Sequence, residues 1–250
     1  MKTKHLAIAA TMGIALSACK KDAEAPPADP ATPTTAHVMA HIAFVNGDAA
    51  FDTLPFTDGQ GRSVRISKLK FYAHGFHLTD DLGATVADFH DRIILADAVA
   101  GTGHIDLGDV QPGHVHELHL ALGLDSASSY GHADQATAPA PLNDPDMTWM
   151  WDVAQGRMFV KLEGFVDANG NGEFEVDEAF GYHGIGANMA PVPWHGHLHT
   201  DLAAGSHHTF HLELDVAALV GGLPLDGTYH NDGAEVQQVM QALHDALHAH

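Results

Sequence analysis

The sequence predicts a mainly β protein, a β-sandwich of antiparallel strands with one C-terminal helix. Three observations carry this prediction. Short apolar segments recur, and Gly, Pro or Asp separates them about every 10–15 residues, as is typical of the strands of a sandwich. Hydrophobic residues make up 45% of the chain, which is enough to bury a core. Near the C-terminus the apolar residues change to a helical spacing.

The N-terminal segment differs from the β region that follows it. Lys2 and Lys4 precede an apolar run, which predicts a signal peptide over residues 1–18. The run is too short to cross a membrane as a helix. It ends in Leu-Ser-Ala-Cys, a sequence that resembles a lipoprotein signal box and implies cleavage before Cys19 and lipidation of its thiol.

The expected domain boundaries follow from this start. Residues 19–36 contain the lipidated cysteine and a segment rich in Pro, Ala, Asp and Thr, which predicts a disordered tether. Residues 37–250 then form the sandwich with its C-terminal helix. We therefore expect a protein of the bacterial periplasm that contacts a membrane only through its lipid anchor.

Segments with the composition or the alternation of strands occur through most of this domain. They are residues 38–45, 63–72, 76–79, 114–122, 157–166 and 207–216. Strict alternation along 114–122 places His114 and His116 on the face of Leu118. Glu117 and His119 then occupy the opposite face.

The C-terminal helix is predicted by apolar residues that share one helical face: Val236, Val239, Met240, Leu243 and Leu247. Asp232 is its expected N-cap. His244 and His248 lie four residues apart on this helix, a spacing that can chelate a metal, with a solvated helix face as the alternative.

The charge balance limits the kind of partner. Acidic residues number 32 and Lys plus Arg 11, so the formal net charge is −21. Nucleic acids and anionic membrane surfaces require a basic footprint, which this chain lacks, whereas cations are favoured. Cys19 is the only cysteine, so thiolate metal sites and cysteine catalysis are excluded from the domain. No G-x-S-x-G, P-loop or H-E-x-x-H motif occurs, and we expect no enzyme.

Histidine is the most unusual feature of the composition, with 22 residues in 250. His195, His197 and His199 alternate with other residues, so in an extended segment they lie on one face. Imidazole suits Cu, Zn and Ni, and this pattern predicts a metal site. The alternative is an exposed polar strand face.

A second group of histidines lies in the late strand. His207 and His211 share its polar face, and one arrangement has them face the first group across a sheet as further metal ligands; the alternative is ordinary surface residues.

Residues 167–178 match the calcium-loop pattern D-x-[DN]-x-[DN]-G-x₅-E at every specified position. The predicted Ca²⁺ ligands are Asp167, Asn169, Asn171, Glu173, Glu175 and Glu178. The segment before this loop is strand-like, so an EF-hand sensor is excluded and a structural Ca²⁺ is expected. An acidic turn without an ion is the alternative.

Met147, Trp149 and Trp151 alternate and are expected to share a strand face. Packing in the core is one interpretation of these side chains. A thioether beside histidines would instead suit Cu(I).

A family resemblance is carried by the middle of the chain. H-A-D-x-A-T-A-P-x-P-L-N begins at His132, M-x-W-x-W at Met147 and F-x-K-L-E-G at Phe159. These runs resemble the MbnP-like family, and weaker similarity extends to the segment that ends in Phe71-Tyr72, to the H-x-G segment at His183 and to the strand that contains Asp215.

The resemblance implies a β-sandwich that binds copper in the periplasm, often beside a di-haem MauG/peroxidase-like partner that oxidises a tryptophan to kynurenine. His132 and His183 match the motif histidines, and Trp149 and Trp151 are the candidates for oxidation. Many relatives carry a four-cysteine pattern that is absent here, so the family does not fix the ligand set.

The expected function is a lipid-anchored copper carrier, buffer or chaperone with histidine ligands. The candidate ligands are His132, His183, His195, His197, His199, His207 and His211. A lipoprotein that scavenges Zn²⁺ or Ni²⁺ is one alternative, and a Ca²⁺-stabilised structural or adhesive lipoprotein is another.

Overall fold

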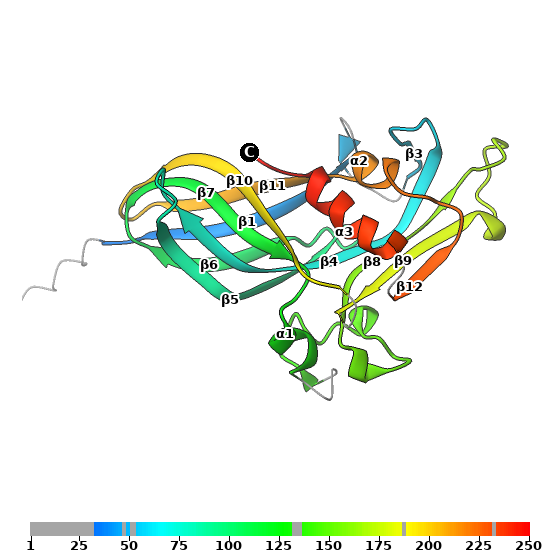
Figure 1. Cartoon of the computed structure of the whole chain (residues 1–250). Helices are drawn as coiled ribbons and strands as arrows, with labels where there is room; N and C mark the ends of the chain where they lie inside the picture. Colours follow the sequence, from blue (N-terminus) through cyan, green and yellow to red (C-terminus); the bar gives the residue numbers. More distant parts are fainter. Residues whose placement is uncertain (1–32, 47–48, 51–53, 132–136, 187–188, 232–233) are drawn as a thin grey trace, which may run out of the picture. The chain divides into compact units, whose positions relative to one another are not determined.

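Two β-sheets form a sandwich around one apolar core in the described part of the chain (Figure 1). The computed structural model describes residues 33–46, 49–50, 54–131, 137–186, 189–231 and 234–250. Within it, Pro33–His250 form one unit. The signal peptide, Cys19, most of the tether, His132 and Asp232 lie outside the described residues. The prediction of a mainly β sandwich is confirmed.

The smaller sheet has five strands among the described residues, in the order β13–β11–β1–β2, and β6 also pairs with β1. Its strands are β1 (Ala36–Asn46), β2 (Ala49–Ala50), β6 (His104–Val110), β11 (His207–Asp215) and β13 (Leu247–Ala249).

The larger sheet has eight described strands in the order β10–β7–β4–β8–β9–β12, and β3 and β5 also pair with β4. Its strands are β3 (Phe56–Thr57), β4 (Ser63–Thr79), β5 (Thr85–Asp97), β7 (Gly113–Leu122), β8 (Met158–Val166), β9 (Ala179–Ile185), β10 (Val192–Leu202) and β12 (Thr228–Asn231). The long strand β4 pairs with β8 over residues 64–71 and with β7 over residues 73–79. The β8–β9–β12 strands and the β7–β10 strands therefore join different halves of β4.

Most strand pairs are antiparallel, as the sequence predicts. Two pairs, β1 with β11 and β9 with β12, are parallel. Parallel pairing needs a long crossover connection, which the short-range pattern of a sequence does not reveal.

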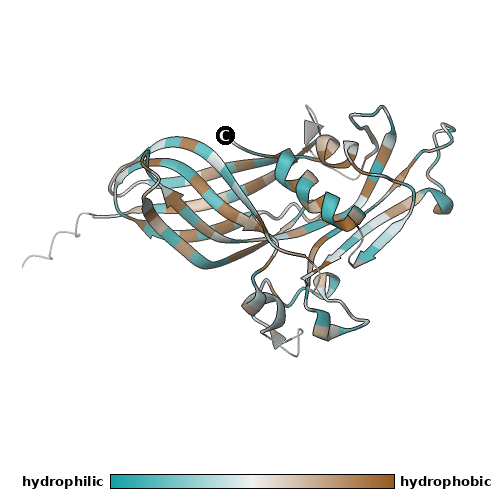
Figure 2. Cartoon of the chain, in the orientation of Figure 1, coloured by the Kyte–Doolittle hydropathy of each residue, from teal (hydrophilic) through white to brown (hydrophobic). Residues whose placement is uncertain are grey.

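The helices are short except at the C-terminus. They are α1 (Ser126–Tyr130), α2 (Val216–Gly221) and α3 (Ala234–Ala246). Figure 2 shows that α3 has one hydrophilic and one hydrophobic side, and its predicted apolar face is buried. The helix ends at Ala246. His248 lies in the following strand, β13, where it pairs with Glu213 of β11. The prediction that His244 and His248 lie on one helix is therefore wrong. No helix in the described part of the chain is long and apolar enough to span a membrane.

Strand β7 departs from the expected alternation. Val115 and Leu118 are both buried, so the outward side chains include the adjacent pair His116 and Glu117. The predicted placement of His114 and His116 on the apolar face is wrong: Val115 between them is buried, and the pairing with β10 shifts between His197 and Thr200. Such a bulge changes which way the neighbouring side chains point.

Candidate metal centre

Two imidazoles meet at the edge of the larger sheet. The parallel pairing of β9 with β12 places His183 directly opposite His230. Their Nδ1 atoms lie 3.0 Å apart, and their ring centroids 4.7 Å. A metal–nitrogen bond is about 2.0 Å long, so both nitrogens are within reach of a single ion.

Glu163 on β8 fixes the tautomer of His183. The Nε2 of His183 lies 2.8 Å from Oε1 of Glu163, and this hydrogen bond lowers the pKa of the Glu163 carboxyl. An ionised carboxylate only accepts, so His183 Nε2 donates and the neutral ring keeps its lone pair on Nδ1. This is the carboxylate–histidine arrangement that usually supports a metal-ligating imidazole.

His230 is also prepared for ligation at neutral pH. Desolvation lowers its pKa below the ordinary histidine value, and the neighbouring His183 lowers it further. Its ring is therefore mainly neutral at pH 7. Since His183 keeps its lone pair on Nδ1, the 3.0 Å contact is a hydrogen bond that His230 Nδ1 donates, and this proton moves to Nε2 of His230 before both Nδ1 atoms bind an ion.

Two indoles lie beside His230. The ring centroids of Trp149 and Trp151 each lie 5.9 Å from that of His230 and 5.6 Å from each other. Trp149 is 8% exposed and Trp151 is 82% exposed. These residues and His183 line one pocket together with Pro145, Asp146, Thr148, Met150, Met158 and Lys161.

The tryptophans do not lie on a strand, so that prediction is wrong. Met147 ends a short 3₁₀ helix (Pro145–Met147), and within the following segment only Thr148 forms an isolated bridge, to Arg157. Met147 is nevertheless buried, which agrees with the core-packing interpretation for this residue.

Ion pairs attach the tryptophan segment to the sheet. Lys70 on β4 lies 3.0 Å from Asp144, 3.2 Å from Asp146 and 3.2 Å from Asp97. Hydrogen bonds from Lys68 and Lys70 lower the pKa of Asp146 to about 2. Burial alone would lower the pKa of Lys70, but its bonds to the carboxylates raise it above the usual lysine value. Lys70 therefore stays protonated and Asp146 stays ionised. Their ion pairs hold the segment that contains Asp146 against β4.

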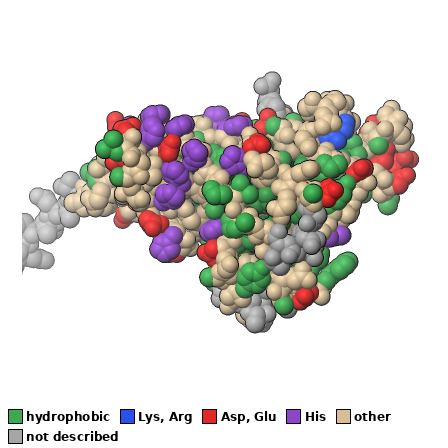
Figure 3. Space-filling model, viewed as in Figure 1, with side chains coloured by type: hydrophobic (Ala, Val, Ile, Leu, Met, Phe, Trp, Pro, Cys, Tyr) green, Lys and Arg blue, Asp and Glu red, His purple; other side chains and the backbone are tan. Residues whose placement is uncertain are grey.

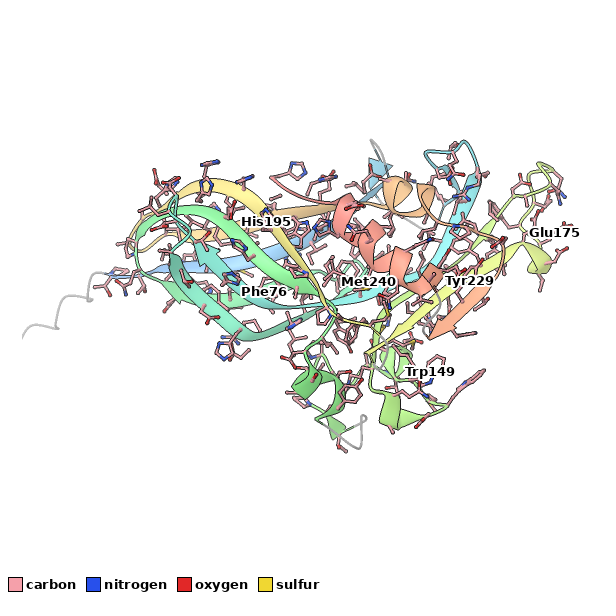
Figure 4. All side chains as sticks on the ribbon, viewed as in Figure 1. Phe76, Trp149, Glu175, His195, Tyr229 and Met240 are labelled. Atoms are coloured by element: carbon pink, nitrogen blue, oxygen red, sulfur yellow. The ribbon has the colours of Figure 1, made fainter. Side chains whose placement is uncertain are left out.

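The three alternating histidines occur on the outer face of β10, far from this pocket along the sheet. Figure 4 shows His195 on β10 and Trp149 in a loop segment that lies well apart from it. His195 and His197 have ring centroids 6.3 Å apart, and His197 and His199 6.0 Å. In Figure 3 histidines gather over this part of the molecule. Within the described residues, Asp81, His114, His116 and His199 can hold a metal ion, and so can His116, Glu117 and His197.

His207 and His211 do not face this group across a sheet. They lie on β11 of the smaller sheet, where the parallel register pairs them with His37 and His41. The ring of His41 also stacks on that of His104, with centroids 3.8 Å apart. That part of the prediction is wrong because β10 and β11, although consecutive, belong to different sheets.

The predicted calcium loop connects β8 to the 3₁₀ helix at Val176–Glu178 and is well organised. Asp167 accepts backbone N–H bonds from Gly170, Asn171 and Gly172 at 2.7–3.0 Å. Glu178 accepts bonds from Ala168, Asn169 and Glu175. Figure 4 places Glu175 in this loop, away from the tryptophan pocket. Calcium binding here stays a prediction.

This calcium prediction can be measured on the full chain. Saturating Ca²⁺ is expected to raise the midpoint of thermal unfolding, because a ligand that binds only the folded state stabilises it. Glu178→Gln is expected to abolish the rise, since the last loop position supplies the bidentate carboxylate. Glu213→Gln, a carboxylate on β11, is the control. Equal midpoints with Ca²⁺ and with a chelator would contradict the prediction.

The fold and the pocket define a β-sandwich protein with paired imidazoles beneath two indoles. The MbnP family model matches residues 36–240, and the chain belongs to the MbnP family. The resemblance read from the sequence motifs is therefore confirmed.

The solved structure of MbnP from Methylosinus trichosporium has the same fold. It matches with a TM-score of 0.51 and 16% sequence identity, over 80% of this chain and 82% of that one. A comparison with curated protein sequences finds no match.

Proposed function

We propose that the protein is a lipid-anchored periplasmic copper-binding protein, a carrier, buffer or chaperone, and that His183 and His230 hold the ion. The observation that carries the proposal is the Nδ1–Nδ1 distance of 3.0 Å, with Glu163 bonded behind His183. When bound, copper would supply redox or transport chemistry. The residues of the chain orient the two nitrogens through the β9–β12 pairing and the Glu163 hydrogen bond.

The pocket lining favours Cu(I) over harder ions. Met150 and Met158 are among the residues that line the pocket together with the indoles. Soft thioether and imidazole ligands select Cu(I), whereas oxygen ligands suit hard cations. Membership of the MbnP family, whose motifs imply copper binding, supports copper as the ion.

A di-haem, MauG/peroxidase-like partner would act on the same pocket. Trp151 projects into solvent, where a macromolecule can reach it, while Trp149 lies behind it, 5.6 Å away between ring centroids. Either indole is a candidate for oxidation to kynurenine. Intact mass and peptide mapping of protein from its native periplasm would identify the modified residue.

The test of copper binding is a competition titration of the full chain with Cu(I) and, separately, Cu(II), each against a chelator of known affinity. We expect one tight site per chain for Cu(I). Affinity no better than micromolar for both oxidation states would refute the proposal.

Acidification provides a check on the type of ligand. Protons compete with metals for imidazole nitrogens, and the ordinary histidine pKa is about 6.5. Because the pKa of His230 is lowered below the ordinary histidine value, copper is expected to stay bound at pH 7 and to leave only as the pH falls below that ordinary value. Full retention at about pH 4.5 is incompatible with imidazole ligation.

A further inference from the structure

Four side chains converge where β7, β10 and the β4–β5 turn meet, on the half of β4 that does not carry the tryptophan pocket. Asp81, His114, His116 and His199 each offer one ligand atom, and these atoms lie within 4.8 Å of one another. We propose that they form a second metal site that takes a divalent cation of the zinc type. This site is independent of the copper pocket.

The backbone is bent to bring His199 into the group. His199 has φ +46°, which makes it the one non-glycine residue with positive φ among those the structure describes. It lies in the bulge of β10, where Leu198 and His199 together oppose His116. Positive φ is uncommon for residues other than glycine, and such strained backbone clusters at functional sites. Its ring thereby comes to 4.3 Å from that of His116, between centroids.

His116 has a nitrogen available for an ion. Its Nδ1 lies 3.0 Å from Oδ1 of Asp81, yet it is buried and makes no hydrogen bond with any described residue. A buried nitrogen without a hydrogen bond costs free energy. A cation between this nitrogen and the carboxylate would satisfy both.

Neighbouring carboxylates orient the other ligands. Oδ1 of Asp201 lies 2.8 Å from Nδ1 of His114, which leaves Nε2 of that ring, 3.7 Å from Asp81, for an ion. Asp80 accepts backbone N–H bonds from Leu82 and Ala84 at 2.9 Å and so orders the turn that carries Asp81. Hydrogen bonds from residues outside the ligand set thus orient His114 and the turn of Asp81, as in established metal sites.

The donor set indicates the class of metal. Three imidazoles are borderline ligands and the carboxylate is a hard one, and Zn²⁺ accepts both types in a tetrahedral set of four. Cu²⁺ would bind the same donors more tightly in direct competition. The adjacent carboxylate of Glu117 lies 3.2 Å from His197 and adds negative charge that favours a divalent cation.

The test uses Zn²⁺ and Co²⁺ with the full chain carrying His183→Ala and His230→Ala, so that the copper pocket does not contribute. Equilibrium dialysis is expected to find tight Zn²⁺ binding, and bound Co²⁺ is expected to give the intense visible absorption of tetrahedral coordination. Adding His116→Ala and His199→Ala should weaken Zn²⁺ binding at least about 100-fold, and Asp201→Asn about 10-fold. His90→Ala removes an exposed imidazole on β5 and should change neither the Zn²⁺ affinity nor the Co²⁺ absorption.

Two results would overturn the proposal. One is an equal, small loss of Zn²⁺ affinity in the His199→Ala and His90→Ala variants, which would indicate adventitious binding by surface histidines. The other is a weak, octahedral Co²⁺ spectrum in the parent protein. Circular dichroism of each variant verifies that the fold is retained. Because Cu(I) binding is measured in a separate experiment, either proposal can fail without the other.

Discussion

Replacing His230 by alanine is expected to weaken Cu(I) binding by more than about 100-fold, since loss of a ligand exceeds the roughly 10–100-fold cost of losing an outer partner. The two Nδ1 atoms 3.0 Å apart act as one chelating pair, so His183→Ala should cause a similar loss. The double variant should be little weaker than either single variant, because residues in one site are not additive. Competition titration against a Cu(I) chelator measures all three.

Glu163→Gln tests the residue that orients the His183 ring without removing either copper ligand. The amide can still accept a hydrogen bond from His183, but it no longer stabilises the charge that develops on the ring when the ion binds. Affinity should therefore fall about 10-fold while the site survives. Trp149 and Trp151 lie beside His230, so bound copper should also quench tryptophan fluorescence in the parent chain and not in His230→Ala.

His90→Ala is the control for this prediction as well, because it removes a histidine whose side chain is 82% exposed and which pairs only loosely with Asp88 at 3.5 Å. Unfolding in urea should be nearly unchanged in His230→Ala, since surface substitutions usually cost within about 0.5 kcal/mol. Undiminished Cu(I) affinity in a folded His230→Ala protein would exclude His230 as a ligand.

Local periodicity predicted the parts of the molecule that depend on local geometry. The alternation of His195 and His197 does place them on one exposed strand face, because a strand has a period of two wherever it is regular. His199 is exposed as well, but it lies in the bulge of β10, where this period is broken. The apolar repeat of α3 does face the core. The alternation along β7 failed at His116, where a bulge in the neighbouring strand changes the register.

The candidate site depended on long-range pairing that periodicity does not encode. His183 was found through the family motif, whereas His230 is 47 residues further along the chain in a strand of four residues. The parallel pairing of β9 and β12 alone brings them together. Asp81 was missed for the same reason, because its partners His114 and His199 are on other strands. Glu163 lies in the F-x-K-L-E-G motif, but its hydrogen bond to His183 becomes visible only once β8 and β9 are paired.

Arg157 connects the stability of the fold to the shape of the pocket. Its side chain is 0% exposed, and burial lowers the pKa of its guanidinium. Nε donates to the carbonyl of Leu142 at 2.8 Å, and one terminal nitrogen, Nη1, donates to those of Ser128 and Ser129 at 2.8 and 3.1 Å. The guanidinium thus ties α1 and the following segment to the start of β8, beside the tryptophans.

Replacing Arg157 by methionine is therefore expected to lower the free energy of unfolding by about 2–4 kcal/mol. Methionine fills a similar volume, but the buried carbonyls lose their donors, and each unsatisfied group costs about 1–3 kcal/mol, partly offset by removing a buried charge. Urea unfolding of metal-free protein measures the change without a contribution from bound ions. Arg92→Met is the matched control, since that exposed side chain makes one long bond of 3.3 Å to Leu107 and should cost less than about 1 kcal/mol.

The same variant tests whether the segment shapes the pocket. Arg157 pairs through its backbone with Thr148, the neighbour of Trp149, so loosening this region should expose an indole that is now 8% exposed. We expect a red shift of tryptophan emission and weaker Cu(I) binding in Arg157→Met, with neither in Arg92→Met. Arg157→Lys should recover little of the lost stability or Cu(I) affinity, because an ammonium is a point charge and cannot bond to three carbonyls as a planar guanidinium does. Unfolding energies equal to the parent in both Arg157 variants would show that these carbonyls find other donors.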